Sequence, residues 1–147
     1  MSRKDFSHTF PVNVAWGESD IFGHTNNVHF IRYLESARVA YCDEVMQHPL
    51  LVGMEAGWLL ADMQCSYLQQ VHYPATLEVC SRVGKIGRSS ATLIAEIYRK
   101  GEDEPVIKSV GVMVWFDFIQ QKSAPVPDYI KQRIAAVDKS VEGVDLV

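Results

Sequence analysis

Residues 27–46 carry apolar side chains at three- and four-residue intervals, a spacing typical of an amphipathic helix. The stripe comprises Phe30, Ile31, Leu34, Ala37, Tyr41 and Val45. Asn26 is the expected N-cap, and the His48-Pro49 pair marks the end because the residue before proline disfavours helix. A helix this long must bury its stripe against another layer, so the rest of the chain has to supply a covering surface.

Four long segments in the second half of the chain are predicted to form that surface. They are rich in β-branched and aromatic residues and span residues 58–73, 75–86, 89–100 and 105–118. The breaks between them are short and contain turn residues, which predicts hairpins. Successive strands are therefore expected to pair antiparallel as a meander.

Two shorter elements flank this arrangement. Before the long helix, Phe10, Val12, Val14 and Trp16 alternate with other residues, which predicts a strand with one buried face. Near the end, residues 125–137 predict a short helix that begins at a proline. Its expected apolar face carries Ile130, Ile134 and Val137.

This order of elements predicts an α+β fold in which an antiparallel sheet wraps around one long central helix. Residues 1–147 are expected to form a single domain, because the sequence shows no repeat, linker or low-complexity run. The segment at 105–118 is apolar at nearly every position, so both its faces need cover, and one helix covers only one of them. A homodimer or homotetramer is expected to cover the other face.

Composition argues against several classes of partner. The net charge is -4 and the Lys and Arg residues are scattered singly, so no basic stripe is available for nucleic acid. No apolar run approaches the roughly 20 residues of a membrane span, and the first residues lack the apolar core of a signal peptide. A cytoplasmic protein with no membrane partner is therefore expected. Cys42, Cys65 and Cys80 show no metal-ligand spacing and are expected to be small buried hydrophobes.

Polar side chains gather in residues 16–30, WGESDIFGHTNNVHF, between the first strand and the long helix. A helix N-terminus presents unpaired NH groups and partial positive charge, which suits a developing anion. An aspartate beside glycine also commonly initiates a turn or caps a helix, so Asp20 has a purely structural interpretation as well. Asp20, His24 and His29 do not have the spacing of a metal site, and no metal is expected.

This stretch, WGESDIFGHTNNVHFIRYLESAR, followed by YLQQVHYPATLEV and the apolar last strand, resembles the hotdog-fold thioesterases of the 4-hydroxybenzoyl-CoA thioesterase type. The resemblance covers residues 10–138. It implies the hotdog fold and hydrolysis of an acyl-CoA or aryl-CoA thioester to the free acid and coenzyme A. It implies no cofactor apart from the coenzyme A of the substrate.

The same resemblance implies site residues. Asp20 occupies the position of the catalytic carboxylate in a D-x-x-G-H-x-N-N motif, and the backbone NH of Asn27 is expected to polarise the thioester carbonyl. Asp20 would act as general base or as nucleophile, and the sequence leaves both open. His24 is a third catalytic candidate, with a structural role equally open.

The remaining candidates are assigned to substrate binding. Gly23 belongs to the motif, and Tyr33, Trp58 and Tyr67 are candidates for an acyl pocket, although filling the core is the default role of buried aromatic residues. Lys85 and Arg88 are candidates for the coenzyme A phosphates.

Several alternatives stay open. The HxNN form also resembles acyl-carrier-protein thioesterases, and the same fold is used by acyl-thioester hydratases and could serve a non-catalytic acyl-thioester binding protein. Glu18 stands where many relatives have aspartate, which leaves a shared role for this acid undecided. Glu35 and Arg38 lie three residues apart on the helix and predict a structural ion pair.

Overall fold

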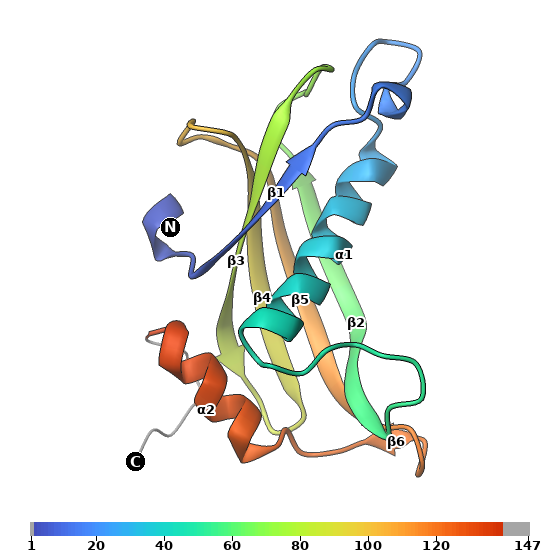
Figure 1. The fold of residues 1–147 in the computed structure, drawn as a ribbon, viewed down its shortest axis with the longest axis vertical. Helices are drawn as coiled ribbons and strands as arrows, with labels where there is room; N and C mark the ends of the chain where they lie inside the picture. The colour runs from blue at the N-terminus through green and yellow to red at the C-terminus, as the bar shows by residue number, and fades with distance from the viewer. Residues whose placement is uncertain (1, 140–147) are drawn as a thin grey trace.

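The computed structural model describes residues 2–139 as one curved antiparallel sheet against which a long helix lies (Figure 1). The strands are β1 His8–Asn13, β2 Ala56–Tyr67, β3 Thr76–Ile86, β4 Ser90–Arg99, β5 Pro105–Asp117 and β6 Lys122–Ser123. The helices are α1 Asn27–Glu44 and α2 Asp128–Val137, with short 3-10 turns η1 Arg3–Asp5 and η2 Trp16–Glu18. The predicted single domain of residues 1–147 includes residue 1 and residues 140–147, which lie outside the described residues.

Helix α1 agrees closely with the predicted helix. The Asn26 side chain accepts a hydrogen bond from the Val28 NH, as expected of an N-cap. The helix buries Phe30, Tyr33, Leu34, Ala37, Tyr41 and Cys42 against the concave side of the sheet. It ends at Glu44, two residues before the predicted end, because Gln47 adopts a positive φ of 52° and turns the chain away before Pro49. The predicted ion pair between Glu35 and Arg38 forms, at 2.7 Å.

The predicted meander is only partly correct. Strands β3, β4 and β5 do pair with their neighbours in sequence, but β2 pairs with β5, so the sheet order is β1-β3-β4-β5-β2. Residues 68–75 therefore cross the end of the sheet instead of forming a hairpin. Eight extended residues reach about 26 Å, more than the roughly 14 Å of three strand spacings, so the crossing is easily spanned. It runs past the start of α1, where the Thr25 NH bonds to the Val71 carbonyl.

Two predicted core positions are wrong. Trp16 is 80% exposed, because β1 stops at Asn13 and the chain turns through η2 before the alternation can continue. Val137 is 44% exposed, because α2 buries Ile130, Ile134 and Ala135 and its last turn brings Asp138 into the core. Asp138 accepts hydrogen bonds there from the Tyr41 hydroxyl and the Val83 NH.

The core that packs against α1 consists of two clusters of buried residues. One surrounds the first turns of the helix, where Phe30, Leu34 and Ala37 meet Leu77, Val79 and Ile97. The other surrounds its last turns and includes the residues from α2. On the convex side of the sheet Val110 of β5 is 40% exposed, so the cover predicted for this face is not supplied within the described chain. The start of α1 emerges at the end of the molecule where β1 and β2 finish, and this end carries the polar stretch (Figure 1).

Candidate active site at the start of α1

A small closed loop, residues 19–25, precedes α1. Ser19 and Thr25 form an isolated antiparallel bridge, and the Asp20 NH donates to the His24 carbonyl at 2.7 Å. Gly23 has a φ of 79° and its NH donates to the Asp20 carbonyl, a conformation that favours glycine. The loop therefore returns the chain within a few residues and keeps Asp20 beside the helix start.

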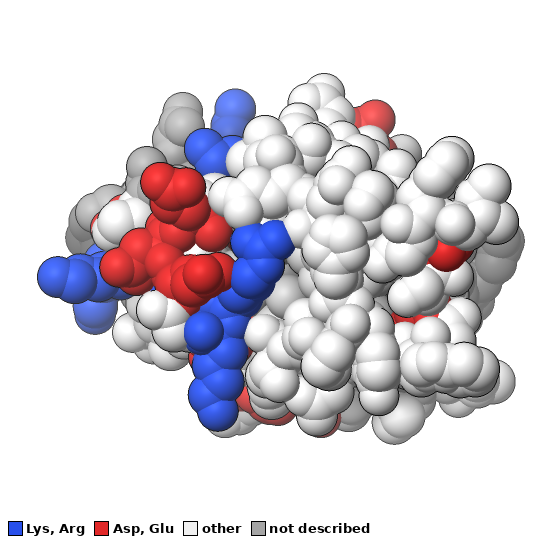
Figure 2. All heavy atoms as spheres, turned by 90° about the horizontal axis from the view of Figure 1, so that it is seen from above, with Lys and Arg blue, Asp and Glu red and all other residues white. Residues whose placement is uncertain are grey.

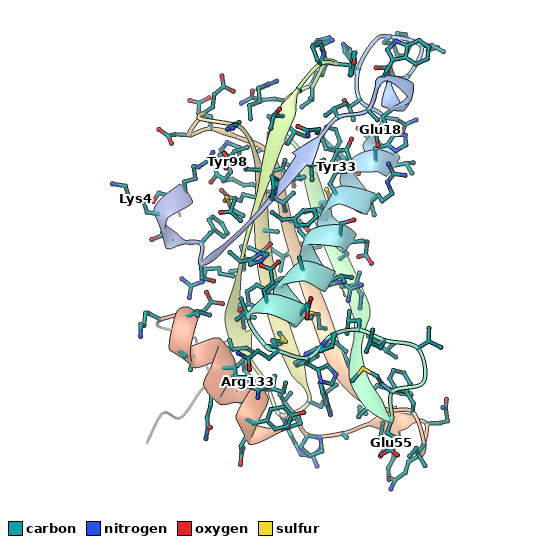
Figure 3. The ribbon with its side chains drawn as sticks, in the orientation of Figure 1. Lys4, Glu18, Tyr33, Glu55, Tyr98 and Arg133 are labelled. Carbon is teal, nitrogen blue, oxygen red and sulfur yellow. The ribbon has the colours of Figure 1, made fainter. Side chains whose placement is uncertain are left out.

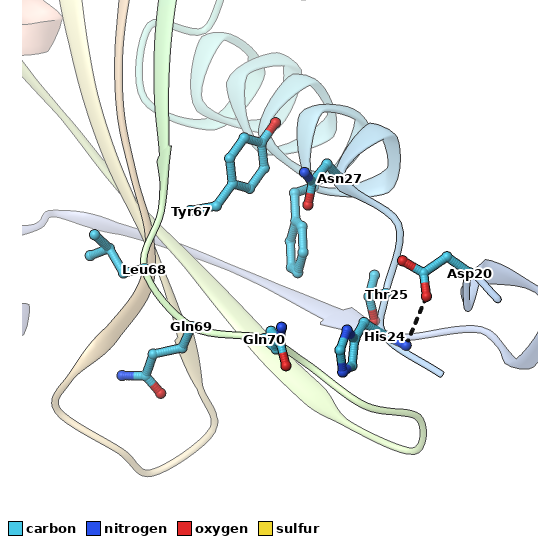
Figure 4. Close-up of a pocket in the computed structure, with 9 residues that line it drawn as sticks. Asp20, His24, Thr25, Asn27, Tyr67, Leu68, Gln69 and Gln70 are labelled. Carbon is cyan, nitrogen blue, oxygen red and sulfur yellow. Dashed lines mark hydrogen bonds between the residues drawn. The ribbon is translucent and has the colours of Figure 1, made fainter. Parts of the chain in front are cut away.

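The Asp20 carboxylate holds this loop together from inside. Its Oδ1 accepts from the Phe22 NH at 2.8 Å and from the His24 NH at 3.2 Å. No residue between 2 and 139 donates to Oδ2. Figure 4 shows the carboxylate directed toward the side of the loop where Thr25 and the start of α1 lie. The turn interpretation of Asp20 is thus correct for one oxygen, and the other is available for chemistry.

The first turn of α1 presents one free NH group. Asn26 satisfies two of the initial donors, because its Oδ1 accepts from Val28 at 3.0 Å and its carbonyl accepts from His29 at 2.9 Å. The Asn27 NH has no acceptor within the part of the chain that the structure describes. This NH lies at the positive end of the helix dipole, where a developing negative charge is stabilised.

A cleft of about 560 Å³ brings these groups together (Figure 4). One wall is the loop and the start of α1, and the opposite wall is the end of β2 and the chain that follows it. The lining residues are Asp20, His24, Thr25, Asn27, Phe30, Tyr67, Leu68, Gln69 and Gln70. The cleft is therefore lined by Asp20, by Asn27, whose NH is free, and by the rings of Phe30 and Tyr67, whose centroids lie 6.3 Å apart.

His24 occupies the wall beside Asp20. Its ring packs edge-on against His72, with centroids 4.7 Å apart. His72 in turn bonds through Nδ1 to the Gly23 carbonyl at 3.1 Å, which ties the loop to the crossing segment. His24 thus lines the cleft and packs structurally, so the geometry favours neither interpretation alone.

The structure separates the predicted substrate-binding residues. Tyr67 lines the cleft, and Gly23 shapes the loop without lining it. Tyr33 is buried outside the cleft and donates its hydroxyl to Glu18. Trp58 lies in the second core cluster, where its ring NH contacts the Met46 sulfur at 2.9 Å and its ring meets Trp115.

Lys85 and Arg88 lie far from the cleft of their own chain. Across the sheet, Tyr67 pairs with Ile107, Ile107 with Ile97, and Ile97 with Val79, so these residues lie at the same level along the strands. Lys85 is six residues beyond Val79 on β3, which corresponds to about 20 Å along the strand. Arg88 follows in the turn between β3 and β4, farther still. Within a single chain, neither residue lines the cleft that contains Asp20.

Sequence reasoning missed the residues at the end of β2 and the anchoring role of Glu18. Leu68, Gln69 and Gln70 form the second wall of the cleft. The two adjacent glutamines at 69 and 70 were the available signal, since they follow directly on the end of the strand. The resemblance singled out Glu18 but left its role undecided, because its partners Arg32 and Tyr33 lie 14 and 15 residues away and meet it only after folding.

Glu18 is a buried carboxylate, with 5% of its surface exposed. Burial by itself raises the pKa of this carboxyl, but hydrogen bonds from the Tyr33 hydroxyl and the Ala15 NH, with the charges of His29 and Arg32, outweigh burial and lower the pKa below its ordinary value. Burial, together with the same contact, raises the pKa of the Tyr33 hydroxyl. Glu18 is therefore ionised in the folded protein at neutral pH.

The lowered pKa of Glu18 predicts a loss of stability in acid. Ionised Glu18 stabilises the fold fully above its unfolded pKa, near 4.5, and this contribution disappears as the pH falls through the lower folded pKa. Thermal unfolding between about pH 7 and about pH 3 should show a smaller acid-induced fall in Tm for Glu18→Gln than for the parent chain. Parallel curves for the two proteins would contradict the prediction.

Within residues 2–139 no three His, Cys, Asp or Glu side chains are grouped so that they could hold a metal ion. Neither helix of this region has the length and apolar character needed to cross a bilayer. The cytoplasmic location stays a prediction.

The sequence model of the thioesterase-like superfamily matches residues 14–134, which include the loop, all of α1 and strands β2 to β6. The chain belongs to the thioesterase-like superfamily. Superfamily membership and the curved sheet against a single long helix together confirm the predicted hotdog fold.

Relatives of this superfamily member include proteins with and without a described activity. The uncharacterized protein YsmA of Bacillus subtilis (strain 168) is 31% identical over 112 residues, 76% of this chain and 74% of that protein. The structure of PA5185 from Pseudomonas aeruginosa has a TM-score of 0.84 at 25% identity, over 96% of this chain and 98% of that one. A thioesterase from Thermus thermophilus, solved with coenzyme A and zinc, has a TM-score of 0.77 at 28% identity, over 92% and 96%.

Proposed function

We propose that the protein hydrolyses the thioester bond of acyl-CoA or aryl-CoA substrates. The observation that carries this proposal is that Asp20, with one carboxylate oxygen free, and Asn27, with a free backbone NH, line the same cleft. A thioester carbonyl between them would meet an NH donor on its oxygen and a carboxylate near its carbon. The thioesterase from Thermus thermophilus, which was solved with coenzyme A, supports coenzyme A as the thiol carrier.

The chemistry needs only groups of this chain and water. In the general-base route, Asp20 takes a proton from water, the resulting hydroxide attacks the carbonyl carbon, and the oxyanion is stabilised by the Asn27 NH. The C–S bond then breaks and the proton passes to the departing thiolate. In the nucleophilic route, Asp20 attacks the carbonyl carbon, the C–S bond breaks and the thiolate leaves. Water then hydrolyses the acyl-aspartate anhydride, which returns the Asp20 carboxylate, releases the free acid and supplies the proton that the thiolate takes up. Both routes require an ionised Asp20, and neither requires a cofactor.

We propose further that the working form is a homodimer or a larger assembly of dimers. Strand β2 has 12 residues and lies at the end of the sheet order, so its outer edge has no partner within residues 2–139. An edge of this length readily pairs with another strand. The end of the molecule that carries the cleft also has a side almost free of charge, seen on the right of Figure 2. Its loop and the adjoining turns expose Trp16, Ile21, Phe22 and Val28.

In a dimer formed by two-fold pairing of β2 strands, Lys85 and Arg88 would again be candidates for the coenzyme A phosphates. In an antiparallel pair related by two-fold symmetry, the start of β2 in one copy lies beside the end of β2 in the other. Arg88 lies at the sheet end where β2 starts, so it would approach the cleft of the second copy. Light scattering should give a mass of two or four times 16.6 kDa, and a monomer at assay concentration would contradict this part of the proposal.

The test of the proposed function is release of free thiol from a panel of acyl-CoA and aryl-CoA esters. Thiol release with formation of the free acid supports the hydrolase. Hydration of an enoyl-CoA without thiol release would support a hydratase, and tight binding without turnover would support a binding protein. An acyl-carrier-protein thioester included in the panel distinguishes the two carriers, because a strong preference for it would reject coenzyme A as the natural carrier.

A further inference from the structure

We propose that Glu18 is a positioning residue that holds the Asp20 carboxylate opposite the free NH of Asn27. This inference rests on the proposed function of the cleft, but the arrangement it describes can also be tested without turnover. Glu18 itself does not line the cleft, and it lies two residues before Asp20 in the chain. Its role is therefore to act through the loop.

The carboxylate of Glu18 accepts hydrogen bonds from residues on both sides of the loop. Oε1 accepts from the Ala15 NH at 2.6 Å and from the Tyr33 hydroxyl at 2.6 Å. Oε2 accepts from Arg32 at 2.5 Å and lies 3.3 Å from Nδ1 of His29. Ala15 precedes the loop, whereas the other three residues lie on one face of the first two turns of α1. One side chain thus fastens the entrance of the loop to the helix.

The backbone of Glu18 completes the attachment. Its carbonyl accepts from the Asn26 NH at 2.9 Å, so the residue before the loop is bonded to the N-cap of α1. Figure 3 shows Glu18 and Tyr33 together at the end of α1 that carries the cleft. Buried charge-assisted bonds of this kind are stronger than neutral ones and are costly to break.

The rest of the loop has few other fixed points. Ile21 and Phe22 at its tip are 92% and 74% exposed. Beyond the bonds inside the loop, it is held by the Thr25 NH on Val71 and by His72 on Gly23, both on the side of the crossing segment. On the helix side, the contacts of Glu18 set where Asp20 lies relative to Asn27. A shift of about 1 Å between reacting groups can lower a rate by roughly 10²-fold.

The experiment compares Glu18→Gln and Glu18→Asp with the parent chain. Glutamine keeps the size but loses the charge, and its amide group presents hydrogen toward the Arg32 and His29 donors. We expect Glu18→Gln to lower kcat for thioester hydrolysis by about 10²-fold with a much smaller change in KM. Glu18→Asp keeps the charge with a shorter reach and should restore part of the lost kcat. Tyr33→Phe removes one donor only and should lower kcat less than Glu18→Gln.

Glu35→Gln is the matched control, because Glu35 makes an ion pair with Arg38 on the same helix without touching the loop. It should leave kcat unchanged. All assays are run well below the Tm of each variant. If Glu18→Gln lowered Tm and left kcat at the parental value, Glu18 would be merely structural and the inference would be overturned.

Amide hydrogen exchange tests whether Glu18 positions the Asp20 loop, and it does so without any measurement of catalysis. The NH groups of Phe22 and His24 are bonded to Asp20, so they should exchange faster in Glu18→Gln, whereas amides in the middle of α1 should not. If the parent chain hydrolysed no thioester and these amides still lost protection, the proposed function would fail and the positioning of Asp20 would stand. Unchanged exchange at both amides would overturn the inference whatever the activity.

Discussion

Replacing Asp20 by asparagine is expected to lower the rate of thioester hydrolysis by about 10³-fold, because the variant can neither take a proton from water nor attack the carbonyl. Asparagine retains an oxygen that can accept from the Phe22 and His24 NH groups, so the loop should keep its shape. The expected change is therefore in kcat, with substrate binding retained. Thiol release under saturating acyl-CoA, with coenzyme A binding measured separately, checks both parts.

Two further variants make this result interpretable. Asp20→Ala removes the loop bonds as well as the acid, so it should be at least as inactive as Asp20→Asn and less stable. Asp43→Asn is the matched control, since Asp43 is exposed near the end of α1, away from the cleft. If Asp20→Asn kept parental kcat while Asp20→Ala unfolded, the bonds to Phe22 and His24 would be the whole role of Asp20.

Replacing Asn27 by proline is expected to lower kcat by about 10²-fold to 10³-fold, the usual effect of removing one oxyanion donor. Proline at the first helical position is well tolerated, since the NH there has no intrahelical acceptor. Asn26, which would precede the proline, already has the extended φ and ψ of -65° and 137° that such a position requires. The variant therefore removes one NH with little change to the helix.

Asn27→Ala separates the backbone from the side chain at this position. It keeps the NH and loses the amide, so it should retain most of the activity that Asn27→Pro loses. Circular dichroism and Tm values close to those of the parent would show that the helix start is intact in both variants. Equal losses in the two would assign the function to the side-chain amide and reject the backbone as the oxyanion donor.

Several features of the site could be predicted because they depend on neighbours in sequence. The N-cap at Asn26 follows from local hydrogen bonding, and the turn around Gly23 follows from the freedom of glycine at positive φ. The motif placed Asp20 and Asn27 within seven residues of each other, so a shared location needed no knowledge of the sheet. The structure places both on the cleft, while their catalytic roles stay proposals.

Other features depend on partners distant in sequence. Tyr33 and Trp58 were candidates for an acyl pocket, with core filling as their default role, because aromatic residues on apolar faces look alike in a sequence. The folded chain assigns one to Glu18 and the other to Met46 and Trp115. Lys85 was expected at the substrate because its turn carries basic residues, but the strand register alone sets its distance from the cleft.

By itself, the sequence determined the long helix, the β-rich second half and the polar loop between strand and helix, since each of these reflects local periodicity or turn chemistry. Only the tertiary structure decided that β2 pairs with β5, that residues 68–70 close the cleft, and that Glu18 fastens the loop to α1. The physical reason is that strand order and buried polar contacts depend on which surfaces meet after the chain has crossed the sheet, and no local pattern encodes that choice.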